Sequence, residues 1–355
     1  MSKPITPETS PQSGLLKVVQ WATGNIGTRS LRAVIEHPNM KLVGLYVHSP
    51  EKVGRDAGEL CGLGPIGIKA TNSIDEIIAL KADCVLYMQQ GANIDDLCRL
   101  LASGANVVTT RVEFHNPPTL DSAVRARIED ACRRGGTSLH STGSSPGFIT
   151  EALPIVLLSL QRRLDGLTIS EFANLSSRNS PELLFDIMGF GKPPVAFNEY
   201  MLAEIKLGFA HSLHALANAI AMPLDSVEVK GECATLRNDV RIAAGELKAG
   251  TVGAQRISIS GMKDGRTLMQ MRLHWYCSTD IEESWNLRDS GWHVLVEGDT
   301  PLDVAIRFPV PLEDYAAMTP GLTAHRAVNA VPVVCAATPG IRTTAELPQV
   351  IAQLG

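Results

Sequence analysis

The feature that most constrains the fold is the segment 17–30, KVVQWATGNIGTRS, where an apolar run leads into a glycine turn and then into a helical pattern. Glycine at 24 lets backbone amides approach a pyrophosphate, and glycine at 27 lets the helix pack closely on the strand. A second apolar strand follows over 41–47, so the segment has the length of a strand–helix–strand unit. The sequence therefore predicts the first turn of a dinucleotide-binding domain.

The glycine pattern of this turn is incomplete, because Trp21 and Ala22 stand where the first glycine of G-x-G-x-x-G is expected. The fragment alone has little specificity, and the strand–helix–strand context supports the prediction. The residues expected at the pyrophosphate are Thr23, Gly24, Asn25, Ile26 and Gly27.

Length and composition indicate a globular protein of about two domains. The 355 residues are 45% hydrophobic and 19% charged, and the net charge is −5. This balance argues against a nucleic-acid or anionic-membrane surface. No apolar run reaches the roughly 18 residues of a membrane span, and the first fourteen residues lack the apolar core of a signal peptide. We expect a cytoplasmic protein whose residues 1–14 are disordered.

The seven cysteines are scattered, with no C-x-x-C pair and no histidine cluster nearby. Most lie in apolar or helical surroundings, which favours small buried hydrophobic side chains over ligands. Neither a disulfide framework nor a metal site is predicted.

The end of the second strand bears on cofactor choice, because an acid there binds the ribose of NAD and repels the 2′-phosphate of NADP. Here His48 and Ser49 follow the strand, and Lys52 and Arg55 lie close behind. Ser49 can donate a hydrogen bond and Lys52 can supply charge, so NADP(H) is favoured. Glu51 leaves NAD(H) possible, and an ordinary solvated turn is the alternative.

Further apolar strands are expected over 84–88, 106–110 and 137–142, with helices over 74–80, 93–103 and 120–134. Five strands that alternate with helices are typical of an α/β fold with a Rossmann-type, doubly wound parallel sheet. Ligands of such sheets lie beyond the carboxyl ends of the strands. That edge gathers the 24–27 turn, Gln89, Thr110 and Glu113, of which Gln89 and Thr110 are candidate cofactor contacts. Glu113 is the candidate catalytic carboxylate, and a surface glutamate is the alternative.

The pattern changes after Phe148, where consecutive strands follow without intervening helices. Strands are expected over 166–175, 225–235, 240–244, 251–260, 266–276 and 291–297, and helices over 150–160, 181–188 and 196–221. This arrangement predicts an α+β domain with an antiparallel or mixed sheet. We expect the dinucleotide-binding domain at 15–148, a substrate and dimerisation domain at 149–322, and a C-terminal segment at 323–355. That segment contains a helix over 323–334 and packs back on the first domain.

The substrate pocket is expected to draw its wall from the start of the second domain. The candidates are Phe148, Phe172, Asn174 and Phe185. Judged alone, such residues more often belong to a core than to a pocket. An aromatic and aliphatic wall would favour a small substrate that is apolar apart from its reacting group.

Five segments in order, 18–27, 106–117, 143–148, 189–191 and 328–332, together resemble the 2,4-diaminopentanoate dehydrogenase family. Its relatives include the native NAD(P)-dependent amine dehydrogenases, and many members carry a dihydrodipicolinate-reductase-like N-terminal domain. The resemblance implies a dimeric two-domain enzyme that interconverts an amine and a ketone or aldehyde, with release or uptake of ammonia.

The resemblance also implies residue roles. A family glutamate that acts on the amine and the attacking water corresponds to Glu113, and Asn329 in the last segment is assigned to the cofactor site. Family members that act on diaminopentanoate carry two adjacent acids at this position, whereas this chain has Val112 before Glu113. One carboxylate favours a simple monoamine. His115 is expected to be structural rather than catalytic.

Three alternatives remain open from the sequence. Dihydrodipicolinate reductase is a poorer match, because its paired histidines are absent. An NADPH-dependent carbonyl or imine reductase would protonate oxygen through a tyrosine or histidine. A cofactor-binding redox sensor would bind NADPH tightly without turnover.

Overall fold

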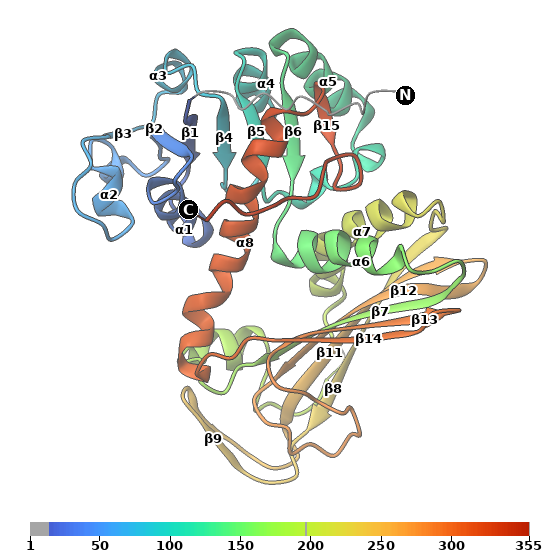
Figure 1. Cartoon of the computed structure of the whole chain (residues 1–355). Coiled ribbons are helices and arrows are strands. Elements are labelled where there is room, and N and C mark those ends of the chain that lie inside the picture. Colours follow the sequence, from blue (N-terminus) through green and yellow to red (C-terminus); the bar gives the residue numbers. More distant parts are fainter. Residues whose placement is uncertain (1–13, 196, 355) are drawn as a thin grey trace.

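The computed structural model describes residues 14–195 and 197–354, so the disorder expected at the N-terminus falls, apart from Gly14, outside the described residues. Two β-sheets dominate the molecule (Figure 1). The first sheet lies near the N-terminal helices, and the second lies across a pair of helices from it. A long helix near the C-terminus, α8, runs past both sheets.

The first sheet has seven strands in the order β15-β6-β5-β4-β1-β2-β3, and every pairing in it is parallel. Its strands are β1 (Leu16–Trp21), β2 (Met40–Tyr46), β3 (Ala70–Thr71), β4 (Cys84–Tyr87), β5 (Asn106–Thr109), β6 (Ser138–Ser141) and β15 (Gly340–Arg342). The order confirms the Rossmann-type prediction. The sequence analysis missed β3 and β15, because strands of two and three residues are too short to show a periodic pattern.

Helices connect these strands and begin where the sequence offers capping side chains. They are α1 (Asn25–Ile35), α2 (Ala57–Leu60), α3 (Ile74–Ala79), α4 (Ile94–Ala102) and α5 (Ser122–Gly135). Ser73, Asn93 and Asp121 each accept hydrogen bonds from the first backbone amides of their helices. The N-cap of α1, Gly24, has no capping side chain.

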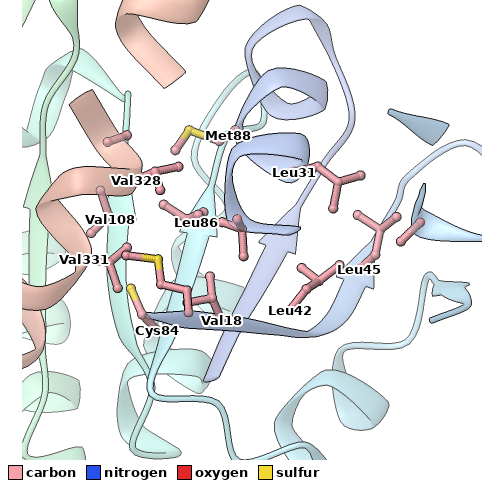
Figure 2. Packing of buried hydrophobic residues seen from close by; sticks show 14 of the residues in the cluster. Val18, Leu31, Leu42, Leu45, Cys84, Leu86, Met88, Val108, Val328 and Val331 are labelled. Carbon is pink, nitrogen blue, oxygen red and sulfur yellow. The ribbon is translucent and has the colours of Figure 1, made fainter. Parts of the chain in front are cut away.

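Helix α8 (Leu312–Cys335) closes one face of the first sheet. Figure 2 shows Val328 and Val331 of α8 beside Val18, Leu86 and Val108 of the strands, all within one buried cluster. The helix is twice as long as the one expected over 323–334, because it continues through Pro320, a residue type that usually interrupts helices. The domain boundary expected between 322 and 323 therefore falls inside α8.

The second sheet has six strands in the order β14-β13-β7-β12-β11-β8. They are β7 (Leu164–Asn174), β8 (Ser226–Thr235), β11 (Val252–Lys263), β12 (Arg266–Tyr276), β13 (Gly291–Gly298) and β14 (Leu302–Arg307), and β9 (Val240–Ile242) pairs with β10 (Gly245–Leu247) separately. The β7–β12 pair is parallel and its neighbours are antiparallel, which confirms a mixed sheet. The sequence analysis missed β10 and β14.

Four helical segments belong to this half of the chain: η4 (Ser144–Ala152), α6 (Leu153–Leu158), η5 (Glu182–Ile187) and α7 (Glu199–Ala219). Ile149 of η4 and Leu213 and Leu216 of α7 form a buried cluster with Ile169 and Met271 of the sheet. Figure 1 shows α6 and α7 between the two sheets. These helices therefore join the two halves of the molecule.

The seven cysteines are all free, and four of them, Cys61, Cys84, Cys132 and Cys277, are buried. Burial raises the pKa of the Cys277 thiol to about 12. Within the described residues, no helix combines the length and apolar character that crossing a membrane requires.

The packing of α1 on β1 gives a stability prediction. A Cβ atom on Gly27 would lie 2.2 Å from the carbonyl oxygen of Ala22, whereas one on Gly24 would meet no atom within 4 Å. We expect Gly27→Ala to lower the free energy of unfolding by about 1–3 kcal/mol, because the helix must move away from the strand. Urea denaturation measures this, with Gly24→Ala as the matched control. Equal stabilities of the two variants would contradict the close packing.

Candidate active site

The turn between β1 and α1 holds a strained conformation. Ala22, which stands where the fingerprint has glycine, has φ +73°, a value that residues with a side chain rarely adopt. The buried Gln20 supports it, because its Nε2 donates to the Ala22 carbonyl at 3.0 Å. The backbone amide of Ala22 also donates to the carbonyl of Tyr46, at 2.9 Å. The unusual residue at 22 therefore adopts the turn that the glycine would have provided.

The N-terminus of α1 has the properties of an anion site. Gly24 is its N-cap, no side chain caps the first amides, and the first turn contains no acidic residue. No atom lies within 4 Å of the position of a Cβ on Gly24, so a ligand can approach the backbone. Free amides and the positive end of the helix dipole suit a phosphate group. Residues 23–27 therefore fit the pyrophosphate of a dinucleotide.

Strands β1 and β4 lie side by side although they are not consecutive, and this switch in strand order creates the crevice that ligands use in such sheets. Gln89, just after β4, bridges the crevice. Its Oε1 accepts from Trp21 Nε1 at 2.7 Å and lies 2.7 Å from His48 Nε2. The structure thus brings together the predicted residues Gln89 and His48 at the carboxyl ends of three strands.

Lys52 lies in η1 (Pro50–Lys52), just after β2. Its Nζ donates to the side-chain oxygen of Thr23 at 3.1 Å and to the Thr23 carbonyl at 3.3 Å. The ammonium group therefore lies beside the pyrophosphate turn. Ser49 is the N-cap of η1 and is partly exposed, with no capping hydrogen bond from its side chain. No acid stands between the end of β2 and Pro50.

Glu113 lies in η2 (Val112–Phe114), which follows β5 and the partly exposed Thr110. Arg111 Nε donates to Glu113 Oε1 at 3.1 Å, and the Glu113 side chain is 26% exposed. Glu113 therefore has an ion-pair partner and remains accessible to solvent.

His115, two residues beyond Glu113, belongs to a buried polar network. Its Nδ1 lies 2.5 Å from Glu151 Oε1, and both side chains are only 1% exposed. Ser212 on α7 donates to Glu151 Oε1, and Thr344, after β15, donates to Oε2. Burial raises the pKa of Glu151, but the charge of His115 and these hydrogen bonds outweigh it and lower the pKa overall. The network joins η2, η4, α7 and the C-terminal segment.

A cavity of about 540 Å³ lies beside the second sheet, against α8 and the segment that follows β6. Ser144 and Ser145 line it from the turn after β6, and α8 contributes Thr319 and Leu322. Trp275 and Trp292 line it from the second sheet. Ser144 and Ser145 follow the carboxyl end of β6, so the cavity adjoins the Rossmann-type sheet there and is the candidate substrate cavity. Glu113 is not among the residues that line it.

Only one of the four expected pocket residues, Asn174, lines this cavity. Phe172 lies on the face of β7 opposite to Glu171 and Ala173, which line the cavity, because successive residues of a strand point to opposite faces. Phe172 stacks on His274 with ring centroids 4.5 Å apart, and Phe185 packs in the same cluster. Phe148 does not line this cavity either, but contacts Trp292, with ring centroids 6.1 Å apart.

The sequence analysis did not single out Glu171, a carboxylate in the cavity wall. Trp292 Nε1 donates to its Oε2 at 3.0 Å. Burial raises the pKa of Glu171, and the hydrogen bond from Trp292 offsets this only in part. A carboxylate with a raised pKa in a cleft is typical of catalytic acids and bases.

The cofactor candidate Asn329 lies on α8, partly exposed. Helix α8 also contacts α1, because Arg29 Nη2 donates to the Ala317 carbonyl at 3.0 Å. In the part of the chain that the structure describes, no three His, Cys, Asp or Glu side chains are grouped as a metal site requires.

The buried His140 on β6 gives a pH prediction. Burial is the main cause that lowers its pKa from 6.5 to about 4, and its Nδ1 hydrogen donates to the Arg342 carbonyl at 2.7 Å. Below pH 6.5, His140 binds a proton in the unfolded chain but stays unprotonated in the folded chain. The free energy of unfolding therefore falls by up to about 3 kcal/mol as the pH drops to 4.

We expect His140→Gln to flatten this slope between pH 6.5 and 4, measured by urea denaturation at several pH values. His325→Gln, which alters an exposed histidine on α8, is the control. If the free energy of unfolding of His140→Gln falls with pH as steeply as that of wild type, the assignment of this pH dependence to His140 is contradicted.

Family models match both halves of the chain. The 2,4-diaminopentanoate dehydrogenase C-terminal domain matches residues 149–355, more than half of the chain. The N-terminus of dihydrodipicolinate reductase matches residues 18–112. A 4-hydroxy-tetrahydrodipicolinate reductase from Synechococcus elongatus (strain ATCC 33912 / PCC 7942 / FACHB-805) is 35% identical, but over only 63 residues, 18% of this chain and 23% of the reductase. The likeness to the reductases is therefore confined to the first domain.

Amine dehydrogenases resemble the chain over its whole length. An amine dehydrogenase from Streptomyces virginiae is 28% identical over 351 residues, 94% of this chain and 96% of that protein. The structure of an amine dehydrogenase from Mycobacterium smegmatis has the same fold, with a TM-score of 0.69 and 19% identity over 95% of this chain and 97% of that one. From the match over residues 149–355, the chain belongs to the 2,4-diaminopentanoate dehydrogenase family.

Proposed function

We propose that the protein is an NAD(P)-dependent amine dehydrogenase. A primary ammonium compound and water are converted to a ketone or aldehyde and ammonium; one hydride goes to the oxidised cofactor and one proton to solvent. The observation that carries the proposal is the cavity in the family's C-terminal domain, which Ser144 and Ser145, just after β6 of the Rossmann-type sheet, also line. The domain identity supplies the amine chemistry, and the switch point supplies the place for a nicotinamide cofactor.

The cofactor-binding roles are proposed from the open α1 N-terminus. The amides of 24–27 would hold the pyrophosphate, with Thr23 and Lys52 beside it. Gln89, His48, Thr110 and Asn329 would surround the rest of the cofactor. When bound, the nicotinamide supplies hydride transfer. Lys52 and Ser49, without an acid at the end of β2, favour NADP(H) over NAD(H).

Proton transfer needs a carboxylate that takes protons from the ammonium group and from water. We assign this role to Glu113, at the carboxyl edge of the sheet, where Arg111 must release it for it to act as a base. Glu171 is the second candidate, favoured by its place in the cavity wall and by the raised pKa of its carboxyl group. An anion at either position would also stabilise a cationic iminium.

The cavity wall supports an amine with an apolar body. Trp275, Trp292, Phe308 and Met188 contribute apolar surface. We further propose that the protein is a homodimer formed through its second domain, as the family resemblance implies. Analytical ultracentrifugation tests this, and a monomer at micromolar concentration would contradict it.

The activity itself is tested in the reductive direction. We expect NADPH oxidation with a small aliphatic ketone to require ammonium and to rise with pH, because free ammonia is the nucleophile that adds to a carbonyl. The measurement is absorbance at fixed ketone across ammonium concentrations and pH values. A rate of NADPH oxidation that does not depend on ammonium concentration would contradict the proposal and favour a carbonyl reductase. Tight NADPH binding without any turnover would favour a redox sensor.

The catalytic assignment is tested by Glu113→Gln, which keeps the shape but removes charge and basicity. We expect kcat to fall by roughly 100-fold or more, while NADP(H) affinity changes by only a few-fold. Glu171→Gln, measured in parallel, separates the two carboxylates. A normal kcat for Glu113→Gln with a large loss for Glu171→Gln would transfer the role to Glu171.

The cofactor preference is tested by titrating NADPH and NADH into wild type and Lys52→Ala. We expect wild type to prefer NADPH and Lys52→Ala to weaken NADPH binding by roughly 10-fold, as for one charged hydrogen bond. Lys69→Ala, which alters a lysine next to β3, is the control. A preference for NADH that Lys52→Ala leaves unchanged would contradict the assignment.

A further inference from the structure

A second cavity, of about 300 Å³, lies between α6, α8 and the chain after β15. It is separate from the candidate substrate cavity, with no lining residue in common. Its wall is mostly apolar and includes Phe148, Leu153, Ile155, Val156 and Leu347. Arg326 of α8 and His140 of β6 supply polar groups. No role proposed above uses this cavity.

Arg326 of α8 is partly buried and lines the second cavity. Its Nε is fully buried and, among residues 14–195 and 197–354, has no hydrogen-bond partner. The guanidinium carbon lies 5.9 Å from the centroid of the Phe148 ring. Because buried donors are almost always paired in folded proteins, an unpaired donor on an arginine that lines a cavity makes this arginine a candidate ligand-binding group.

The neighbouring titratable groups do not neutralise Arg326. Glu151 is the anion that acts on it and raises its pKa, but burial is the larger cause and the pKa of Arg326 is lowered overall. The Glu151 oxygens already accept from Ser212 and Thr344. His140, with a pKa lowered by burial to about 4, is uncharged at neutral pH. The cavity therefore combines one unsatisfied positive charge with aliphatic and aromatic walls.

We propose that this second cavity binds a small organic monocarboxylate. The planar guanidinium of Arg326 donates two parallel hydrogen bonds to the carboxylate, a geometry that arginine and carboxylate share. The aliphatic chain of the ligand lies against Phe148 and the exposed apolar residues of α6. Phe148 also contacts Trp292 of the substrate cavity, so the two cavities share one aromatic contact.

The experiment is a calorimetric titration of hexanoate into the protein without cofactor, compared with hexanamide, its uncharged analogue. We expect saturable binding of hexanoate and roughly 10-fold or more weaker binding of hexanamide, the scale of a charged hydrogen bond. Arg326→Leu should lose hexanoate to the same extent, whereas Arg266→Leu, which alters an exposed arginine at the start of β12, should not.

Val156→Trp provides a second test, because Val156 lies on the rim and is 52% exposed, so a larger side chain fills the cavity without disturbing the core. We expect it to abolish hexanoate binding while thermal unfolding stays unchanged. Absence of hexanoate binding, equal affinity for hexanamide, or full affinity in both Arg326→Leu and Val156→Trp would overturn the proposal. The titration measures no turnover, so its result is independent of the proposed dehydrogenase activity.

Discussion

The contact between Gly27 and the carbonyl of Ala22 is the constraint on which the cofactor site depends. Only a residue without a side chain allows α1 to approach β1 this closely. The approach places the uncapped N-terminus of α1 over the switch point between β1 and β4. The hydrogen bond from the Gln20 side chain to the Ala22 carbonyl stabilises the positive φ of Ala22, so a buried polar residue compensates for a missing glycine. The backbone strain at Ala22 occurs where the candidate cofactor site needs a sharp turn.

A buried polar network links the two halves of the molecule. Glu151 receives hydrogen bonds or charge from His115, Ser212 and Thr344, which come from three separate parts of the chain. Removing one partner of such a network leaves a buried charge unpaired, which is costly. The same network fixes the segment that follows Glu113. The geometry of the candidate active site is thus linked to the packing of α7 and of the C-terminal chain.

The position of charge distinguishes the two carboxylates and the two cavities. Glu113 lies at the sheet edge predicted from sequence, but Arg111 pairs with it and solvent reaches it. Glu171 lies in the cavity wall with a neutral indole as its partner. Arg326 lies in a second cavity, where its Nε has no hydrogen-bond partner in the described chain. Each environment follows from which strand face or helix face the residue occupies.

The sequence by itself determined the parallel sheet, the glycine turn, the approximate positions of helices α3, α4 and α5, and a second domain with consecutive strands. These features depend on local patterns of a few residues, which are visible in one segment at a time. The sequence also assigned the 24–27 turn, Gln89, Thr110 and Glu113 to one edge of the sheet, because parallel strands end at one edge.

Only the tertiary structure decided which side chains face the substrate cavity and which acid lines it. Phe172 and Glu171 are adjacent in sequence, yet they point to opposite faces of β7, and the register with β12 and β13 decides which face meets the cavity. The length of α8 and the short strands β3 and β15 likewise depend on partners distant in the chain. Long-range packing and hydrogen bonding, which a local pattern does not contain, stabilise these elements.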